Sequence, residues 1–296
     1  MTFENPALRI KNLQDIICCP VCKNSLTFDG NSLWCAPCGL AYTITEGIPD
    51  LVVHDLEYCD QIRVECETDF FSSQFGQRNG YQVYALDEYP RILDAMQLGH
   101  NNNNDRKKVL SIGCASGVFE RELMKRNYQV VGVDLVTSLL QRCEFLTVRA
   151  DAVSLPFIMN AFDHVICIGV LHHVPEALHA KALREILRVL KPGQTAHFFE
   201  PNATTRSAIT HPASQFLKAR TLIEKPISLP AFQRLATALF SKVNVSYIKE
   251  VKLVNLHKMY TFLYQVVKMI FDCIPGTNNK EFFVLIAHKQ RSMTGG

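Results

Sequence analysis

The sequence predicts an α/β protein in which a doubly wound, seven-stranded sheet follows a small N-terminal β domain. Three observations predict this fold. Two Cys-x-x-Cys pairs enclose a short hairpin pattern near the start of the chain. From residue 107 onward, short apolar strands alternate with amphipathic helices, which is typical of a sheet with helices on both faces. A turn of small residues follows the first of these strands, where such sheets approach a ligand.

The composition is that of a packed globular protein and excludes a disordered or collagen-like chain. Of the 296 residues, 48% are hydrophobic and 20% are charged. The net charge of +3 is unevenly distributed, because residues 191–296 carry fourteen basic and five acidic side chains, a net +9. The last third of the chain can therefore attract phosphates, an anionic substrate or lipid head groups.

The first pair of motifs predicts a metal site. The four cysteines of the two pairs are Cys19, Cys22, Cys35 and Cys38. Their spacing suits a tetrahedral Zn²⁺ site, and residues 26–34 between the pairs have the pattern of strand, turn and strand. We expect a zinc ribbon with a structural metal, because four thiolates leave no open position for a substrate. Free core cysteines or a redox pair are the alternative, and Cys18 is expected to be a buried thiol.

The N-terminus has no basic stretch followed by an apolar run, so it does not resemble a secretory signal. The eleven cysteines are too unevenly spaced for a disulfide scaffold. Both observations favour a reducing compartment, and we expect a cytoplasmic protein.

Residues 54–106 are expected to form a helical linker or lid. Pro90 can start a helix that ends near Gly99. Aromatic residues are frequent before this helix, so the segment either packs as a connector against the main domain or covers a substrate pocket. The predicted parts of the chain are therefore a zinc ribbon (1–53), this linker and a main domain (107–296).

The main domain begins with a nucleotide-type βαβ unit. A buried strand over 108–112 leads into the turn 113–117, and a second strand over 130–133 ends at Asp134. Glycines in such a turn let the backbone approach a ligand, and the next helix offers free N–H groups. Asp134 is placed to accept hydrogen bonds from both hydroxyls of a ribose. The Gly-x-x-x-Gly spacing differs from the dinucleotide-binding fingerprint.

Five motifs follow in order along residues 107–201. They are Gly113-Cys-Ala-Ser-Gly117, Ala150-Asp-Ala-Val-Ser-Leu-Pro-Phe157, Phe162-Asp-His-Val165, Leu171-His-His173 and Leu190-Lys-Pro-Gly193. This series resembles the class I S-adenosylmethionine-dependent methyltransferases of the type 11 group. The resemblance implies a Rossmann-like methyltransferase sheet with S-adenosylmethionine as the cofactor. Two departures are Ser111, where many relatives have an acidic residue, and Ala115, where glycine is usual; they weaken cofactor binding unless another group substitutes.

The resemblance also implies a set of cofactor-binding residues. They are Gly113, Ala115 and Gly117 beside the methionine and ribose, Asp134 at the ribose, Leu135 against the adenine, Asp151 and Ala152 at the adenine edge, and Gly169 at the sulfonium. The alternative interpretation of Asp134 and Asp151 is that they are ordinary turn carboxylates. His172 or His173 either acts as a base or holds its loop, and we assign no catalytic residue. The tripeptide Glu200-Pro-Asn202 is a pocket-rim candidate or a plain turn.

The first fifty residues resemble the small zinc-ribbon proteins that activate transfer-RNA methyltransferases. The likeness rests on the cysteine pairs and on the segment Tyr42-Thr-Ile-Thr-Glu-Gly-Ile-Pro49, in which Thr43 replaces the usual proline. Such ribbons bind other proteins or serve as fused modules. The resemblance therefore names no reaction for this chain.

The C-terminal part has an apolar stripe at helical spacing over residues 263–274. It predicts either a helix that caps the sheet or an amphipathic lid that contacts a greasy substrate or a membrane surface. The function predicted for the whole chain is methyl transfer to a small or lipid-like metabolite. One alternative is methylation of a base in ribosomal or transfer RNA, which the charge of the last third favours. The other is a non-catalytic binding scaffold, which Ser111 and Ala115 suggest.

Overall fold

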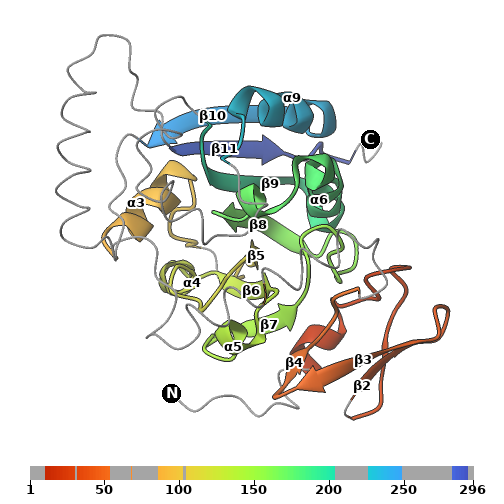
Figure 1. The fold of residues 1–296 in the computed structure, drawn as a ribbon. Coiled ribbons are helices and arrows are strands. Elements are labelled where there is room, and N and C mark those ends of the chain that lie inside the picture. The colour runs from red at the N-terminus through yellow and green to blue at the C-terminus, as the bar shows by residue number, and fades with distance from the viewer. Residues whose placement is uncertain are drawn as a thin grey trace, which may run out of the picture.

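The computed structural model describes residues 11–30, 32–53, 68, 86–102, 105–203, 226–248 and 282–292. Figure 1 shows a seven-stranded sheet with helices packed against it and a small four-stranded sheet beside its β7 edge. Both predicted parts, the doubly wound sheet and the N-terminal β domain, are therefore present. Residues 54–67, 69–85 and 103–104 of the predicted linker and the predicted helix over 263–274 lie outside the described residues.

The small sheet is the N-terminal ribbon. Its antiparallel strands are β1 (Thr27–Phe28), β2 (Ser32–Cys35), β3 (Leu40–Thr45) and β4 (Ile48–Pro49). Asp29 closes the hairpin between β1 and β2, because its carboxylate accepts the backbone N–H of Ser32 at 2.8 Å and the Ser32 hydroxyl at 2.8 Å. Gly30 supplies the left-handed backbone of this turn, at φ +97°. The predicted strand–turn–strand pattern is confirmed.

The large sheet has the strand order β10-β11-β9-β8-β5-β6-β7. Its strands are β5 (Lys108–Ile112), β6 (Gln129–Asp134), β7 (Leu146–Arg149), β8 (Phe162–Ile168), β9 (Leu190–Pro201), β10 (Lys242–Ile248) and β11 (Phe282–His288). Strand β11 runs antiparallel to both of its neighbours, and the other pairs are parallel. Because β5 lies between β6 and β8, the chain reverses its direction of winding there, and ligands of such sheets bind at this point.

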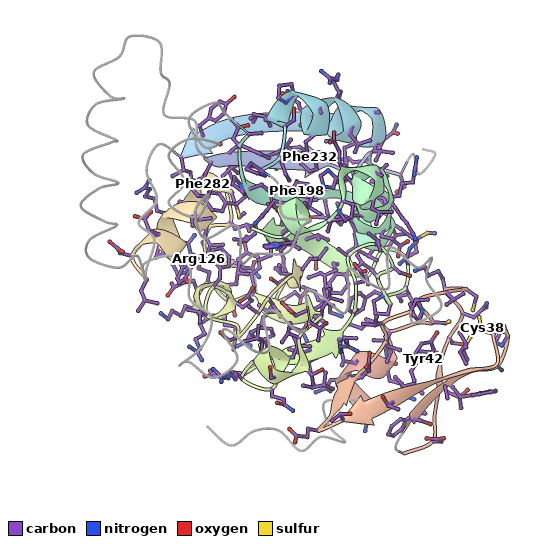
Figure 2. All side chains as sticks on the ribbon, viewed as in Figure 1. Cys38, Tyr42, Arg126, Phe198, Phe232 and Phe282 are labelled. Carbon is purple, nitrogen blue, oxygen red and sulfur yellow. The ribbon has the colours of Figure 1, made fainter. Side chains whose placement is uncertain are left out.

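Helices cover both faces of this sheet. One face packs against α6 (Glu176–Val189) and α9 (Leu229–Leu239), and the other packs against α3 (Glu88–Ala95), α4 (Glu120–Lys125) and α5 (Thr137–Leu140). Neighbouring residues of β9 point to opposite faces, as the pleat requires. The ring centroids of Phe198 and of Phe232 in α9, both labelled in Figure 2, lie 5.3 Å apart with the rings edge to face. The rings of Phe199 and Phe282 stack, with their centroids 5.1 Å apart.

The end of α6 differs slightly from the sequence-based prediction. The apolar spacing of residues 183–190 predicts a helix that includes Leu190 and stops at Pro192-Gly193, with a strand from residue 195. In the structure α6 ends at Val189 and β9 begins at Leu190. The backbone N–H of Ala161 donates to the Val189 carbonyl at 2.8 Å, and Leu190 pairs with Phe162. The chain therefore enters the sheet directly from the helix.

The helix predicted from Pro90 to near Gly99 is α3, which begins at Glu88 and already ends at Ala95, and it packs in the core of the main domain. Arg126, labelled in Figure 2, donates to the Asp94 carboxylate and the Leu98 carbonyl, both at 2.7 Å, and to the Pro90 carbonyl at 3.1 Å. These bonds fasten α3 to the end of α4. None of the helices in the described ranges has the length and apolar character needed to cross a membrane.

Candidate functional site

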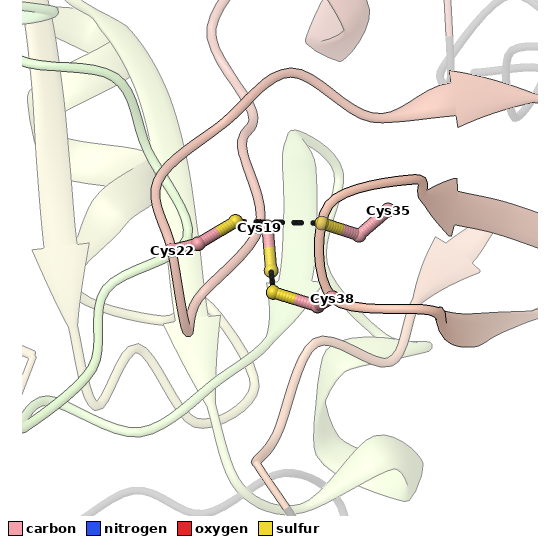
Figure 3. Close-up of side chains that lie close together, drawn as sticks. All are labelled: Cys19, Cys22, Cys35 and Cys38. Carbon is pink, nitrogen blue, oxygen red and sulfur yellow. Dashed lines mark hydrogen bonds between the residues drawn. The ribbon is translucent and has the colours of Figure 1, made fainter.

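The structure gathers the four ribbon cysteines into one cluster (Figure 3). All four sulfurs lie within 4.8 Å of one another, with 3.9 Å between Cys19 and Cys38 and 3.4 Å between Cys22 and Cys35. A tetrahedron of sulfurs around Zn²⁺ has its sulfurs about 3.8 Å apart, because Zn–S bonds are about 2.3 Å long. The donor set and its spacing therefore fit one structural Zn²⁺. Cys18 lies outside the cluster, and burial raises the pKa of its thiol to about 11.

The ribbon docks on the edge of the large sheet beside β7. The Asp50 carboxylate and the Arg149 guanidinium are 2.7 Å apart, and the backbone N–H of Leu51 donates to the Arg149 carbonyl at 2.9 Å. Asp50 pairs with Arg149 as a parallel bridge, so the ribbon continues the sheet. Sequence reasoning missed this docking, although the buried residues Ile48 and Leu51 are an apolar signal for it.

A second set of backbone bonds joins the ribbon to the loop after β7. Cys18 N–H donates to the Pro156 carbonyl at 2.9 Å, and Ile158 N–H donates to the Ile16 carbonyl at 2.9 Å. The Ser154 hydroxyl donates to the Pro20 carbonyl at 2.7 Å. The ribbon therefore holds both ends of residues 149–158.

The turn after β5 has three residues in the left-handed region. Gly113, Ala115 and Gly117 have φ values of +70°, +46° and +75°. A Cβ at Gly113 would lie 2.2 Å from Val170, and one at Gly117 would lie 2.7 Å from Phe145, so side chains are excluded at both positions. Ala115 adopts this conformation with a methyl group, which costs about 1 kcal/mol relative to glycine. The turn keeps its glycine-like shape despite the departure at this position.

Asp134 ends β6 and is bonded to this turn. Its Oδ2 accepts the Ala115 N–H at 2.9 Å and its Oδ1 accepts the Val136 N–H at 3.0 Å. Burial raises the pKa of this carboxyl, whereas the backbone donors act to lower it. These bonds are those of a turn carboxylate, and a carboxylate with about four lone-pair sites can still accept a further donor.

Asp151 and Ala152 lie at the neighbouring strand end, after β7. The Ala150 N–H donates to the Asp134 carbonyl at 3.1 Å and joins the two strand ends. Asp151 is buried, and its carboxylate accepts the Val153 N–H at 3.2 Å. Both predicted carboxylates thus stand at adjacent carboxyl ends of parallel strands.

Gly169 follows β8, with φ +64°, and begins a loop that Glu200 organises. One Glu200 carboxylate oxygen accepts the N–H groups of Val170 and Leu171 at 2.9 and 2.8 Å, and the other lies 2.8 Å from His172 Nδ1. Glu200 lies inside β9 and is completely buried, so it is neither a pocket rim nor a turn. The sequence signal for this role is that Glu200 directly follows the apolar residues Phe198 and Phe199.

A carboxylate lies beside Ser111 although the sequence lacks one at that position. The Ser111 hydroxyl donates to Glu120 Oε1 at 2.6 Å, and Glu120 is buried at the start of α4. Burial raises the pKa of Glu120 to about 7. Sequence reasoning did not identify Glu120, because only the packing of α4 against β5 brings the two residues together.

A cavity of about 560 Å³ lies between the first turns of α6 and α9. Its walls are mainly apolar and include Val174, Pro175, Glu176, His179, Ile227 and Phe232. His179 Nε2 lies 2.9 Å from the Leu171 carbonyl and 3.0 Å from the Val174 carbonyl, which fixes the loop beside the cavity. The cavity therefore begins where the loop after β8 ends.

Comparison with known families assigns both parts of the chain. Residues 110–198 match the family described as Methyltransferase domain, and residues 11–47 match the family described as Trm112p-like protein. The chain thus carries a class I S-adenosylmethionine-dependent methyltransferase domain behind a Trm112p-like zinc ribbon. Both resemblances predicted from the motifs are confirmed.

The individual relatives are methyltransferases whose names refer to different substrates. Cycloartenol-C-24-methyltransferase 1 of Oryza sativa subsp. japonica is 35% identical over 138 residues, which cover 39% of this chain and 38% of that protein. Ubiquinone biosynthesis O-methyltransferase of Yersinia pestis is 26% identical over 155 residues, or 43% of this chain and 63% of that protein.

A solved structure of similar fold is phosphoethanolamine N-methyltransferase 2 of Haemonchus contortus in complex with S-adenosyl-L-methionine. It has a TM-score of 0.54 and 16% identity, over 76% of this chain and 60% of that one. The chain spans less than two thirds of the length of each of these three proteins.

Proposed function

We propose that this protein transfers the methyl group of S-adenosylmethionine to a small or lipid-like metabolite. The observation that carries the proposal is the meeting of four strand ends of β5, β6, β7 and β8 on one edge of the sheet. There the turn 113–117 donates through the Ala115 N–H to the Asp134 carboxylate, and the Asp134 carbonyl accepts the N–H of Ala150, the residue before Asp151.

This arrangement supports each of the proposed contacts with the cofactor. The turn of Gly113, Ala115 and Gly117 would lie along the methionine and ribose of the cofactor, because its backbone can be approached closely. Asp134 would accept the ribose hydroxyls, with Leu135 against the adenine. Asp151 would accept the adenine amino group while Ala152 donates its N–H to the ring, and Gly169 would line the sulfonium pocket.

The bound cofactor supplies a methyl group that is already activated by its sulfonium. The protein has to orient the acceptor in line with that methyl group and exclude water. The loop from Gly169 to Val174 runs from the proposed cofactor edge, where Val170 lies beside Gly113, to the cavity between α6 and α9, which Val174 lines. This loop is therefore placed to align an acceptor.

The character of the cavity supports a small or lipid-like acceptor. Val174, Ile227 and Phe232 are buried apolar side chains in its wall. The matches to enzymes named for cycloartenol and for ubiquinone biosynthesis support the same substrate class.

The alternative acceptor, an RNA base, is supported by the net +9 of residues 191–296. Peripheral contact with a membrane would suit a lipid-like substrate.

Four thiolates that bind Zn²⁺ are best preserved in a reducing compartment, which supports a cytoplasmic location.

We propose the domain boundaries 1–53, 54–106 and 107–296. Within the middle segment, α3 packs on the large sheet. The ribbon is proposed to be a fused module that acts within this chain rather than a free partner of another protein.

The test uses the full zinc-loaded chain. Calorimetric titration with S-adenosylhomocysteine should give one site per chain. Incubation with methyl-labelled S-adenosylmethionine, a small-molecule cell extract and total RNA should then place the label in the small-molecule fraction. Label confined to RNA would establish the alternative acceptor, and the absence of cofactor binding would leave only a scaffold role.

A further inference from the structure

The wall of the cavity between α6 and α9 includes a buried histidine, His179. The two helices pack side by side on one face of the large sheet (Figure 1), and the cavity lies between their first turns. His179 belongs to α6, is 7% exposed and lines the cavity. The cavity volume of about 560 Å³ lies within the range of about 300–1,000 Å³ that is typical of small-molecule sites. A ligand in this cavity would therefore meet the imidazole ring.

The hydrogen bonds of His179 determine which ring nitrogen carries the proton. Nε2 lies 2.9 Å from the Leu171 carbonyl and 3.0 Å from the Val174 carbonyl. A carbonyl oxygen only accepts hydrogen bonds, so Nε2 is protonated and donates to both. In the neutral ring Nδ1 then carries a lone pair. The ring of Phe232 meets the imidazole edge to face, with the centroids 6.1 Å apart, and limits its rotation.

Nδ1 of His179 makes no hydrogen bond within the described part of the chain. The same nitrogen is enclosed by protein atoms in His173 and His197, whereas in His179 it is not. Because the ring lines the cavity, a molecule bound there can donate to this nitrogen. An acceptor in an apolar cavity is costly when it has no donor, so a ligand with an O–H or N–H group would be favoured.

The rest of the wall suits an apolar and uncharged molecule. Val174, Ile227 and Phe232 are buried apolar side chains of the wall. Among the described residues that line the cavity, Glu176 is the one acidic side chain, and none is lysine or arginine. A carboxylate, sulfate or phosphate group on the ligand would therefore meet a negative charge and no basic side chain to pair with. The wall discriminates against anions.

Building on the function proposed above, we propose that this cavity binds the methyl acceptor, and that the acceptor is a neutral, largely apolar molecule whose O–H or N–H group donates a hydrogen bond to His179 Nδ1. The loop that His179 holds supports this place for the acceptor, because it runs from Val170, beside the cofactor turn, to Val174 in the cavity wall. Fatty acids and other anionic lipids are excluded by the same wall. His179 selects the ligand and takes no part in proton transfer.

Three naphthalene probes test this recognition on the full zinc-loaded chain at pH 8, where a histidine ring is ordinarily neutral. Naphthol donates a hydrogen bond, methoxynaphthalene has the same rings without the donor, and naphthalenesulfonate carries a negative charge. Fluorescence titration should show one naphthol site per chain, at least about tenfold tighter than the site for methoxynaphthalene. Naphthalenesulfonate should also bind at least about tenfold more weakly than naphthol.

Two substitutions separate the hydrogen bond from the apolar cavity. His179→Leu removes Nδ1, so affinity for naphthol should fall at least about tenfold and match that for methoxynaphthalene within about twofold. Ala231→Trp fills the space between the helices and should abolish binding of both probes, while His179 and its loop contacts are kept. Matched controls are His100→Leu and Ala238→Trp, at exposed positions outside the described cavity wall, and they should bind both probes like the wild type.

Methyl transfer connects the cavity with the proposed reaction. With labelled S-adenosylmethionine and a small-molecule extract, the rate should fall at least about 20-fold in Ala231→Trp, because the acceptor can no longer be positioned. Affinity for S-adenosylhomocysteine should stay within about twofold in this variant. Ala238→Trp should match the wild type in both measurements.

Equal affinity of the wild type for naphthol and methoxynaphthalene, tight binding of naphthalenesulfonate, or no binding of naphthol would overturn the proposal. An Ala231→Trp protein that keeps at least half of the wild-type rate would do the same. Failure of the proposed function itself looks different, because the wild-type protein would then bind no S-adenosylhomocysteine, whatever it binds in the cavity.

Discussion

Arg149 at the end of β7 and Asp50 of the ribbon form an ion pair of 2.7 Å, although 99 residues separate them in the sequence. The same guanidinium donates through Nε to the Leu135 carbonyl at 2.8 Å. One side chain therefore connects the zinc ribbon to the residue predicted to contact adenine. The ribbon is fixed at the same end of the sheet as the candidate cofactor site.

Breaking this pair should destabilise the protein. Asp50 and Arg149 side chains are 25% and 14% exposed, so Asp50→Asn should reduce the free energy of unfolding by about 1–2 kcal/mol, between the values for surface and buried pairs. Urea unfolding monitored by fluorescence measures the shift of the midpoint. Glu144→Gln is the matched control, because Glu144 pairs with Arg121 at 45% exposure on both sides and should cost less than about 0.5 kcal/mol. Equal effects of the two variants would show that the docking contact has no special role.

Zinc removal should weaken cofactor binding. The ribbon has too few residues for a core of its own, so loss of the metal should unfold it and free residues 149–158. We expect affinity for S-adenosylhomocysteine to fall at least about tenfold after chelation and to recover when one equivalent of Zn²⁺ is added. Calorimetry with parallel metal analysis measures both quantities. Unchanged affinity in the metal-free chain would separate the ribbon from the cofactor site.

The cofactor turn should not tolerate a side chain at its first glycine. Gly113→Ala would place a methyl group 2.2 Å from Val170 at φ +70°, and we expect a loss of about 2–3 kcal/mol in stability together with loss of cofactor binding. Gly99→Ala is the control, because no atom lies within 4 Å of its added Cβ and its backbone is not left-handed. Thermal melts and calorimetry compare the two. A Gly113→Ala protein that binds like the wild type would place the cofactor elsewhere.

Glu120 should make stability depend on pH. Its pKa in the folded chain is about 7, above the ordinary value of 4.5, so the folded state retains a proton that the unfolded state releases. Stability from this group is therefore full below about pH 4.5 and falls as the pH rises to about 7, by up to about 3 kcal/mol. Glu120→Gln should remove this dependence and be more stable than the wild type at pH 8. Unfolding curves of the variant and the wild type that coincide at pH 8 would contradict this role of Glu120.

Local patterns in the sequence predicted much of the fold and part of the site. The cysteine cluster and the βαβ unit around Asp134 depend on residues close in sequence, whose spacing determines their geometry. The alternation of apolar strands and helices likewise predicted all seven strands, because burial on both faces requires it.

The contacts that sequence reasoning missed join residues far apart or on different elements. The pairing of Asp50 with Arg149 depends on how the ribbon meets a sheet edge, which no local pattern encodes. Glu120 lies beside Ser111 only because α4 packs over β5. Glu200 was predicted to be a rim or turn residue because the apolar pattern ends before it. In the structure β9 pairs with β11 through Pro201, so Glu200 lies within the strand.

A crystal structure of the zinc-loaded chain with S-adenosylhomocysteine would test the proposed cofactor site directly. We expect the adenosyl group at the edge formed by β5, β6 and β7, with ribose hydroxyls within hydrogen-bonding distance of Asp134 and the adenine amino group at Asp151. A nucleoside bound elsewhere, or an empty edge at saturating ligand, would contradict it.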